Sequence, residues 1–110
     1  MSLTLDQYQV LALRTEDTTR STRDRLINAG LGLAGESGEI ADHIKKYLYH
    51  GHDLDGSFLA KEIGDVLWYL AVMSDAIGLT LSEVAQMNVN KLNARYPEGF
   101  SEERSKNRDG

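Results

Sequence analysis

The longest regular pattern in this sequence is an apolar stripe at helical spacing between Asp24 and Tyr49. Its members follow one another at steps of three, four or seven residues, which places them on one face of an α-helix. They are Leu26, Leu33, Ile40, Ile44 and Tyr47. A helix of ~26 residues is about 39 Å long, so it needs other elements beside it to bury that face. No segment alternates between apolar and polar residues as a half-buried strand would, and we therefore predict an all-α fold.

Boundary signals and apolar stripes indicate three further helices. Capping boxes occur at Thr4–Gln7 and Thr80–Glu83, where a threonine and the side chain three positions later satisfy backbone N–H groups reciprocally. We expect the first helix to run to about Arg14, the third to span about Ser57 to Ile77, and the fourth to end at Pro97. The second and third helices are joined by a short turn and should be antiparallel neighbours, and association would enlarge the modest core of so small a domain. The prediction is a four-helix, antiparallel bundle-like domain that oligomerises.

Composition narrows the classes of function. A chain of 110 residues is the size of one domain, which we expect over residues 1–100, with a charged, flexible tail over 101–110. The absence of cysteine excludes disulfides and thiolate metal sites. The net charge of −5 argues against a nucleic acid polymer as partner. No apolar run approaches the roughly 20 residues of a membrane span, and the first residues do not resemble a signal peptide. We expect a cytoplasmic protein that does not bind membranes.

Two pairs of acidic residues are the strongest candidates for chemistry. Glu36 and Glu39 are three residues apart in one predicted helix, and so are Glu62 and Asp65 in the next. A step of three is nearly one helical turn, so each pair shares a face. Glu36 is expected at the edge of the apolar stripe, and Glu39 nearer to solvent. A single pair of this kind is common on a solvated helix face, which is the simpler interpretation of either pair alone.

The two pairs could meet if their helices are antiparallel neighbours. Two unit charges 4 Å apart interact by about 4 kcal/mol at an effective dielectric constant of 20, so four carboxylates together would need protons or cations. A set of oxygen ligands without nitrogen or sulfur suits Mg²⁺, with Mn²⁺ as the alternative. His43 follows Glu39 by four residues and is a less favoured candidate ligand.

Four glycines lie in the same predicted helix, at positions 30, 32, 35 and 38. Each costs about 1 kcal/mol relative to alanine in a helix interior, so they need a reason. Gly30 to Gly35 match the dinucleotide-binding pattern G-x-G-x-x-G, but no strand precedes them, which argues against that fold. Close approach of a neighbouring helix is one explanation, and room for a ligand beside Glu36 is another. A helix that begins later than Asp24 is a third.

Basic and amide side chains could complement an acidic metal site. Asn88, Lys91 and Arg95 lie along one flank of the fourth helix, where they are candidates to bind a phosphate chain, a sugar or a base. The alternative is a solvated helix face. The segment Thr15–Arg23 has no apolar residue and is expected to be a mobile loop. Alternatively, this loop closes over a phosphate through one of three arginines, Arg20, Arg23 or Arg25.

Taken together, these motifs resemble a known family. Glu36-x-x-Glu39 is followed after 22 residues by Glu62-x-x-Asp65, within Glu-Ile-Gly-Asp-Val-Leu-Trp-Tyr-Leu. Later comes Asn88-x-x-Lys91-Leu-x-x-Arg95-Tyr-Pro-x-Gly-Phe100. This combination resembles the MazG-like nucleotide pyrophosphohydrolases, which belong to the all-α nucleoside triphosphate pyrophosphatases. The resemblance covers about Leu26 to Phe100.

The resemblance implies an activity and a set of site residues. It implies Mg²⁺-dependent cleavage of a nucleoside triphosphate between the α and β phosphates, which gives a monophosphate and pyrophosphate, in a homodimer or homotetramer. A role in housecleaning of the nucleotide pool is expected. By motif matching, Glu36, Glu39, Glu62 and Asp65 would be the metal ligands, and Asn88 and Lys91 would contact substrate. Related dUTPases and phosphoribosyl-ATP pyrophosphatases share the architecture, so the substrate stays open.

Within this hypothesis, a carboxylate takes the proton of the attacking water, and Glu39 or Glu62 is the candidate base. Lys91, Arg95 or a loop arginine would offset charge on the phosphates. The rival hypothesis is a non-catalytic, oligomeric helical module that binds a nucleotide or a partner. A phosphohydrolase of other metabolites, releasing orthophosphate, is a third.

Overall fold

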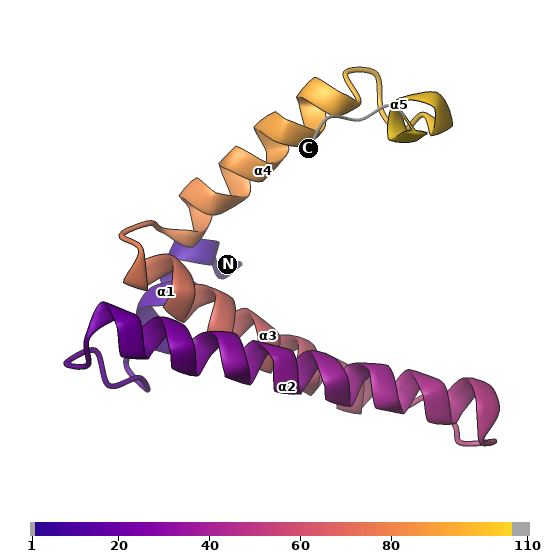
Figure 1. Ribbon diagram of the computed structural model, residues 1–110, viewed down its shortest axis with the longest axis horizontal. Coiled ribbons are helices and arrows are strands. Elements are labelled where there is room, and N and C mark those ends of the chain that lie inside the picture. The colour runs from indigo at the N-terminus through magenta and orange to yellow at the C-terminus, as the bar shows by residue number, and fades with distance from the viewer. Residues whose placement is uncertain (1, 107–110) are drawn as a thin grey trace.

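The computed structural model describes residues 2–106 and is built from helices (Figure 1). They are α1 (Leu5–Leu13), α2 (Thr22–Tyr49), α3 (Gly56–Ala76), α4 (Leu81–Arg95) and α5 (Glu102–Lys106). No strand occurs among the described residues, apart from an isolated bridge between Pro97 and Gly99. The all-α prediction with four main helices is confirmed. The short helix α5 lies where the sequence led us to expect a flexible tail, and residues 107–110 of that tail lie outside the described part of the chain.

Side-chain caps set where the helices begin. Both predicted capping boxes are present, at Thr4 with Gln7 and at Thr80 with Glu83. The helix α2 begins two residues before the expected Asp24, because the Ser21 side chain accepts a hydrogen bond from the Asp24 N–H. The sequence-based prediction did not identify Ser21 as the N-cap of this helix.

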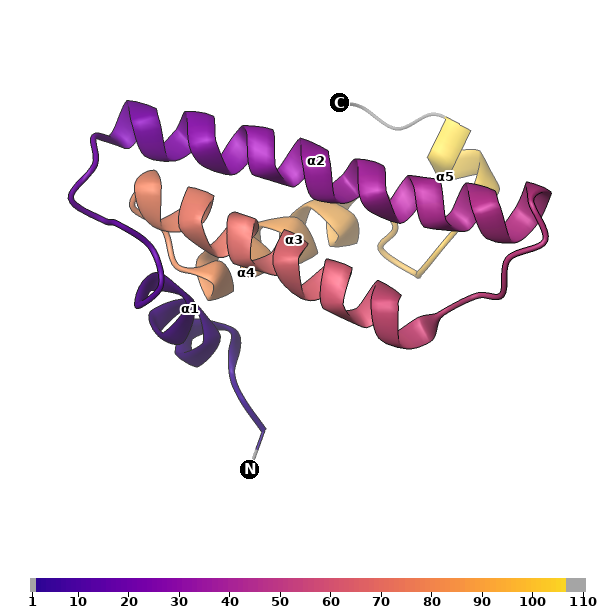
Figure 2. The same cartoon turned by 90° about the horizontal axis from the view of Figure 1, so that it is seen from below.

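The helices α2 and α3 form a long antiparallel hairpin. They run side by side in both ribbon views, joined by the turn at residues 50–55 (Figure 2). Asp55 caps α3 by accepting a hydrogen bond from the Phe58 N–H. The helix α1 packs against α3 near the other end of the hairpin. This hairpin is the part of the predicted bundle that holds both acidic pairs.

The helix α4 leaves the hairpin at a steep angle. It is bent by 96° from α3, and in Figure 1 it projects away from the other helices. The chain turns at Gly78, whose φ of +81° is left-handed and easy only for glycine. The start of α4 is fixed to α1, because the Ser82 N–H donates to Asp6 at 2.9 Å. In an antiparallel bundle, α4 would pack along the α2–α3 hairpin. Within residues 2–106, α4 does not pack along it.

Length and composition also bear on membrane insertion. Among the described residues, no single helix is long and apolar enough to cross a membrane. The helices α3 and α4 meet that criterion only as a pair, which is bent by 96°.

A small core joins α1, α3 and the start of α4. It consists of Ala12, Ala71 and Leu81, with Tyr8 and Trp68 packed against it. The side chain of a buried glutamine also bridges these elements. Gln9 donates from its amide to the Ala71 and Leu79 carbonyls and accepts the Leu81 N–H, at 3.1 to 3.2 Å. The three bonds link α1 to α3, to the turn that follows it and to the start of α4, so this buried polar group is satisfied.

The single tryptophan and a buried arginine anchor the connection between α1 and α2. The indole N–H of Trp68 reaches the Ala12 carbonyl at 3.2 Å and the Thr15 hydroxyl at 2.8 Å. Arg25 donates to both carboxylate oxygens of Glu16 and, at 2.6 Å, to Asp75. The side chains of Arg25 and Glu16 are only 10% and 6% exposed. Arg25 is thus held by two carboxylates, which disfavours it as the arginine that closes over a phosphate.

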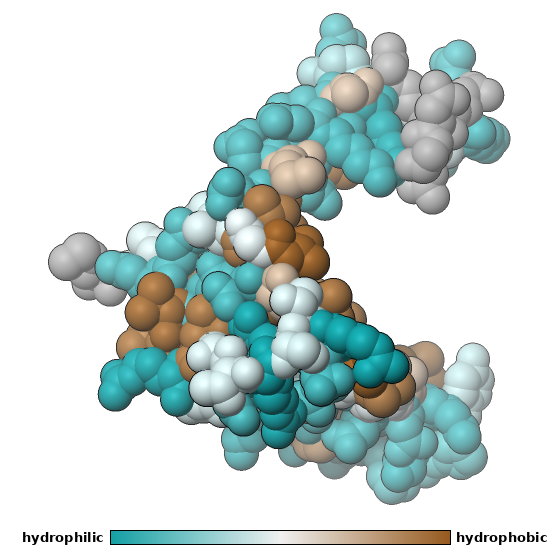
Figure 3. Space-filling model, turned by 60° about the vertical axis from the view of Figure 1, so that its left-hand side comes forward, coloured by the Kyte–Doolittle hydropathy of each residue, from teal (hydrophilic) through white to brown (hydrophobic). Residues whose placement is uncertain are grey.

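The molecule is extended for its mass. Its accessible surface is 8029 Å², whereas a compact monomer of 12.2 kDa would expose about 6,100 Å². Its radius of gyration is 16.9 Å, against about 13 Å for a compact domain of this length. Figure 3 shows apolar surface in the recess where α4 leaves the rest of the molecule. On α4 itself, Met87, Val89 and Leu92 are all exposed. The apolar residues of α4 do share a face of the helix, but most of that face is not buried within the chain.

Candidate metal centre

The antiparallel hairpin brings the acidic pairs of α2 and α3 together. Glu36, Glu62 and Asp65 each offer a carboxylate oxygen, and these oxygens all lie within 4.8 Å of one another. Glu62 is 9% exposed, Glu36 is half-buried and Asp65 is exposed. The cluster therefore has a sheltered side, made by the two glutamates, and an open side at Asp65.

Two oxygens of this cluster lack a hydrogen-bond donor. Oε2 of Glu36 and Oε2 of Glu62 are buried, and neither has a partner among the described residues. Buried acceptors without a donor are costly and rare in folded proteins, so these two oxygens call for a proton or a cation. A divalent cation of the Mg²⁺ type binds carboxylate oxygens and would satisfy both. The donor set present here fits such an ion.

The fourth acidic residue also contacts the cluster. Hydrogen bonding with Glu36, then burial, then hydrogen bonding with Glu39 raise the pKa of Glu62 to about 7, with the negative charges of both neighbours adding to the effect. Glu39 is thus beside Glu62, although it is exposed. Its exposure relative to Glu36 agrees with the order expected from the helical wheel. At neutral pH without a cation, Glu62 therefore holds a proton for part of the time, which relieves the repulsion among these carboxylates.

The glycines of α2 fall into two groups. A Cβ atom at Gly32 would overlap the ring of Tyr69, so only glycine leaves room for that ring where it lies. Tyr69 lies one turn beyond Asp65, so this contact between the two helices is next to the cluster. At Gly30, Gly35 and Gly38 an added Cβ would meet nothing within 4 Å. Close approach therefore explains Gly32 and leaves the other three unexplained.

A groove of about 660 Å³ continues from Glu39 toward the α2–α3 turn. It is lined by Gly35, Gly38, Glu39, Asp42, His43, Lys46, His52 and Phe58. The ring of His43 stacks on Phe58 with 4.8 Å between centroids, and its Nε2 accepts the Asp55 N–H at 3.1 Å. His43 thus belongs to the wall of the groove and to the turn, and it lies outside the group of carboxylates.

Comparison with known proteins agrees with this site. The sequence model of the MazG nucleotide pyrophosphohydrolase domain matches residues 26–100, which include all four carboxylates. The chain belongs to the MazG family. It is also similar to the Gene 37 protein of Mycobacterium phage L5, with 40% identity over 85 residues that cover 71% of this chain and 72% of the phage protein. No solved structure matches the chain.

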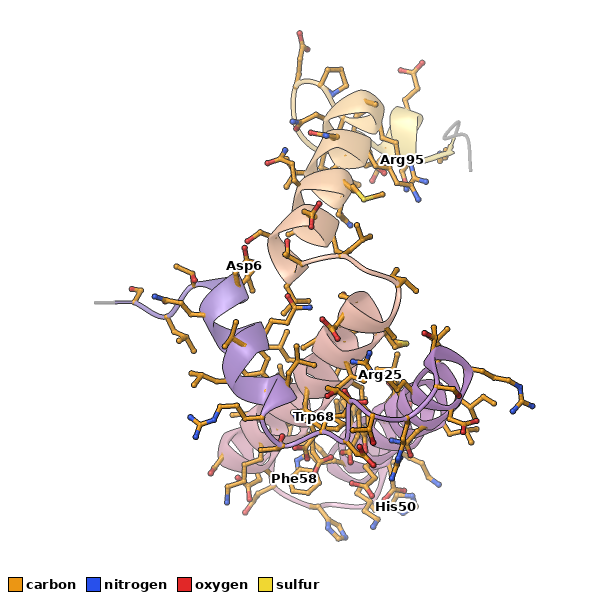
Figure 4. The ribbon with its side chains drawn as sticks, turned by 90° about the vertical axis from the view of Figure 1, so that its left-hand side faces the viewer. Asp6, Arg25, His50, Phe58, Trp68 and Arg95 are labelled. Carbon is orange, nitrogen blue, oxygen red and sulfur yellow. The ribbon has the colours of Figure 1, made fainter. Side chains whose placement is uncertain are left out.

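Within the MazG domain, the predicted substrate-binding row lies apart from the carboxylates. Asn88, Lys91 and Arg95 are on α4, which diverges from the hairpin. Figure 4 shows Arg95 at the far end of that helix, well separated from Phe58 and Trp68 on α3. Asn88 and Lys91 are exposed. The structure does not bring this row to the carboxylates of the same chain, and its role in substrate binding stays a prediction.

The helix α1, which precedes the matched MazG region, adds a residue that the sequence did not single out. Burial, together with the negative charge of Asp65, raises the pKa of Tyr8. Its ring packs against the α1–α3 core, and its hydroxyl is near enough to Asp65 to feel that charge. The sequence alone does not point to Tyr8, because a contact between residues this far apart in the chain has no local signal.

Proposed function

We propose that this MazG-family protein is a nucleoside triphosphate pyrophosphohydrolase that depends on Mg²⁺ or Mn²⁺. The observation that carries the proposal is the meeting of carboxylates from α2 and α3, with a buried oxygen on Glu36 and on Glu62 that lacks any donor. Family membership supports the same reaction. The reaction is hydrolysis between the α and β phosphates, and its products are a nucleoside monophosphate and pyrophosphate.

Glu36, Glu62 and Asp65 would hold the cation. When bound, a divalent cation neutralises phosphate charge and lowers the pKa of a bound water. Glu39 is the favoured base, because it is exposed and lies beside Glu62. It would accept a proton from water as the water oxygen attacks a phosphorus of the α–β bridge and the bridging oxygen leaves. Glu62, which is buried and whose pKa is raised to about 7 by its acidic neighbours and by burial, is the second candidate.

Association with a second copy of the chain would bury surface that a single copy leaves exposed. The accessible surface exceeds that of a compact monomer by roughly 1,900 Å², more than the ~800 Å² that each partner buries in a standard interface. The exposed apolar residues of α4 supply surface for such contact. Because α4 points away from the carboxylates of its own chain, Asn88 and Lys91 would reach substrate only in a partner's site. We propose a homodimer or homotetramer on these grounds.

The decisive experiment measures both possible products. Purified protein is incubated with Mg²⁺ and a panel of ribonucleoside, deoxyribonucleoside and oxidised triphosphates, and pyrophosphate and orthophosphate are assayed separately. Pyrophosphate release that stops on chelation supports the proposal. Orthophosphate alone, or nucleotide binding without turnover, would overturn it in favour of another phosphohydrolase or a binding module. Preference for oxidised or other aberrant triphosphates would support a housecleaning role.

A further inference from the structure

Two glycines leave part of α2 bare beside the carboxylates. An added Cβ at Gly35 or Gly38 would meet no atom within 4 Å, in contrast to Gly32. Both glycines line the groove that starts at Glu39. Each costs about 1 kcal/mol of helix propensity, and no neighbouring helix explains that cost. Open space at both positions, on the same groove, leaves room for a ligand where side chains would otherwise stand.

The wall of the groove is aromatic and fixed. His43 and Phe58 are stacked, with 30° between their planes. The Asp55 N–H donates to Nε2 of His43, so in the neutral ring the proton is on Nδ1. Along α2, Asp42 and Lys46 form an ion pair at 3.0 Å, and both also line the groove. The groove thus combines a flat face with hydrogen-bond donors and acceptors.

The charge of the groove indicates which part of a nucleotide it suits. Asp42 and Lys46 compensate each other and Glu39 is acidic, so the acidic and basic residues that line the groove have no net positive charge. A pyrophosphate group would need net positive charge here, and the groove does not supply it. A planar, neutral ring suits the bare helix surface and the aromatic wall. The volume of about 660 Å³ lies within the roughly 300–1,000 Å³ typical of small-molecule sites.

We propose that this groove is the nucleobase subsite of the enzyme. The inference rests on the proposed function, because it takes the phosphates to lie at the carboxylate cluster. The base lies over the backbone of Gly35 and Gly38, next to the ring of Phe58. Its polar edge faces Asp42 and Lys46, which offer an acceptor and a donor.

A pair of matched variants tests the subsite. Gly38→Leu places a side chain on the floor of the groove, whereas Gly30→Leu places the same side chain on α2 outside the groove. Both should fold, since neither Cβ meets a neighbour. In the presence of Mg²⁺, each variant is titrated with the four common deoxynucleoside monophosphates and, separately, with pyrophosphate.

We expect Gly38→Leu to bind the monophosphates at least about tenfold more weakly than wild type, with pyrophosphate affinity within about twofold of wild type. Gly30→Leu should bind both like wild type. Unchanged monophosphate binding by Gly38→Leu would overturn the subsite, and so would an equal loss of both ligands, which would place the damage at the carboxylates.

A second measurement separates the subsite from the reaction. In wild-type protein, nucleotide titration should shift the backbone amide signals of Gly35 and Gly38 in nuclear magnetic resonance spectra. These shifts would support the subsite even if no triphosphate were hydrolysed, an outcome that would overturn only the proposed function. Hydrolysis without these shifts would overturn the subsite and leave the proposed function standing.

Discussion

The ring of Tyr69 on α3 lies directly against the backbone of Gly32 on α2, where any side chain at position 32 would overlap it. This contact is one helical turn from Glu36 on one helix and one turn from Asp65 on the other. The place of the Tyr69 ring between α2 and α3, next to the carboxylates, therefore depends on the absence of a single methyl group.

Replacing that glycine should destabilise the protein. Gly32→Ala improves helix propensity by about 1 kcal/mol, but overpacking against Tyr69 typically costs about 1–3 kcal/mol. We expect a net loss of free energy of unfolding, measured by urea denaturation. The matched control Gly30→Ala meets open space and should be neutral or stabilising. Equal behaviour of the two variants would show that Tyr69 yields without cost.

Removing the charge of Glu39 should stop the reaction without unfolding the protein. Glu39 is exposed and, as the favoured base, would contribute roughly 100-fold or more to the rate. We expect Glu39→Gln to lose at least that factor in Mg²⁺-dependent pyrophosphate release, with an unchanged circular dichroism spectrum. Glu98→Gln, at an exposed position beyond α4, serves as control. Near-normal turnover in Glu39→Gln would remove Glu39 from the site.

The raised pKa of Glu62 predicts a pH-dependent stability without metal. Its pKa rises from 4.5 to about 7 on folding, chiefly because of Glu36, so the folded state binds more protons between these values. The free energy of unfolding should therefore fall as pH rises from 4.5 toward 7 and then level off. Mg²⁺ should reduce this fall, since a cation favours the ionised carboxylates. The metal-free Glu62→Gln variant should lose the same part of the pH dependence, and a slope equal to that of wild type would contradict the assignment.

The buried ion pair of Arg25 predicts a large loss of stability. In Arg25→Met, the Glu16 carboxylate stays buried without its partner, which typically costs about 3–5 kcal/mol. Arg23→Met is the control, because that side chain is 81% exposed and its pair with Asp24 should contribute less than about 1 kcal/mol. Thermal unfolding of both variants compares the two sites. A small effect at Arg25 would mean that Glu16 reaches water when the arginine is absent.

A charge on the exposed stripe of α4 should weaken self-association. Leu92→Glu places a carboxylate among exposed apolar residues that a second copy would cover, whereas Asn93→Glu adds the same charge at an exposed polar position. Sedimentation equilibrium should show at least about a tenfold weaker association for Leu92→Glu than for Asn93→Glu. Equal association constants for the two variants would place the interface elsewhere.

Local signals predicted the helices and the acidic cluster, and they were insufficient for the direction of α4. Spacing alone puts Glu36 and Glu39 on one face, and a short turn makes their helix the neighbour of Glu62 and Asp65. An apolar stripe predicts that a face is buried, but it does not say by which chain. The stripe of α4 therefore suggested a closed bundle, whereas the left-handed turn at Gly78 directs the helix outward.

The same limit applies to the glycines and to polar core residues. Gly32 and Gly38 have equal helix propensity, and only the position of Tyr69 on another helix separates a packing glycine from one that faces open space. Gln9 can be buried because three backbone groups, on α3, in the following turn and at the start of α4, satisfy its amide. Such pairings between distant residues have no signature in the spacing of one segment.

Trp68 is an intrinsic fluorescent probe of the contact between α1 and α3. The chain has one tryptophan, and its indole N–H is held by Ala12 and Thr15 at the end of α1. Detachment of α1 would expose this indole to water and shift its emission, while the long hairpin kept its helical ellipticity. Coincident melting curves by fluorescence and circular dichroism would therefore identify α1 and the hairpin as one cooperative unit, and separated curves would identify them as two.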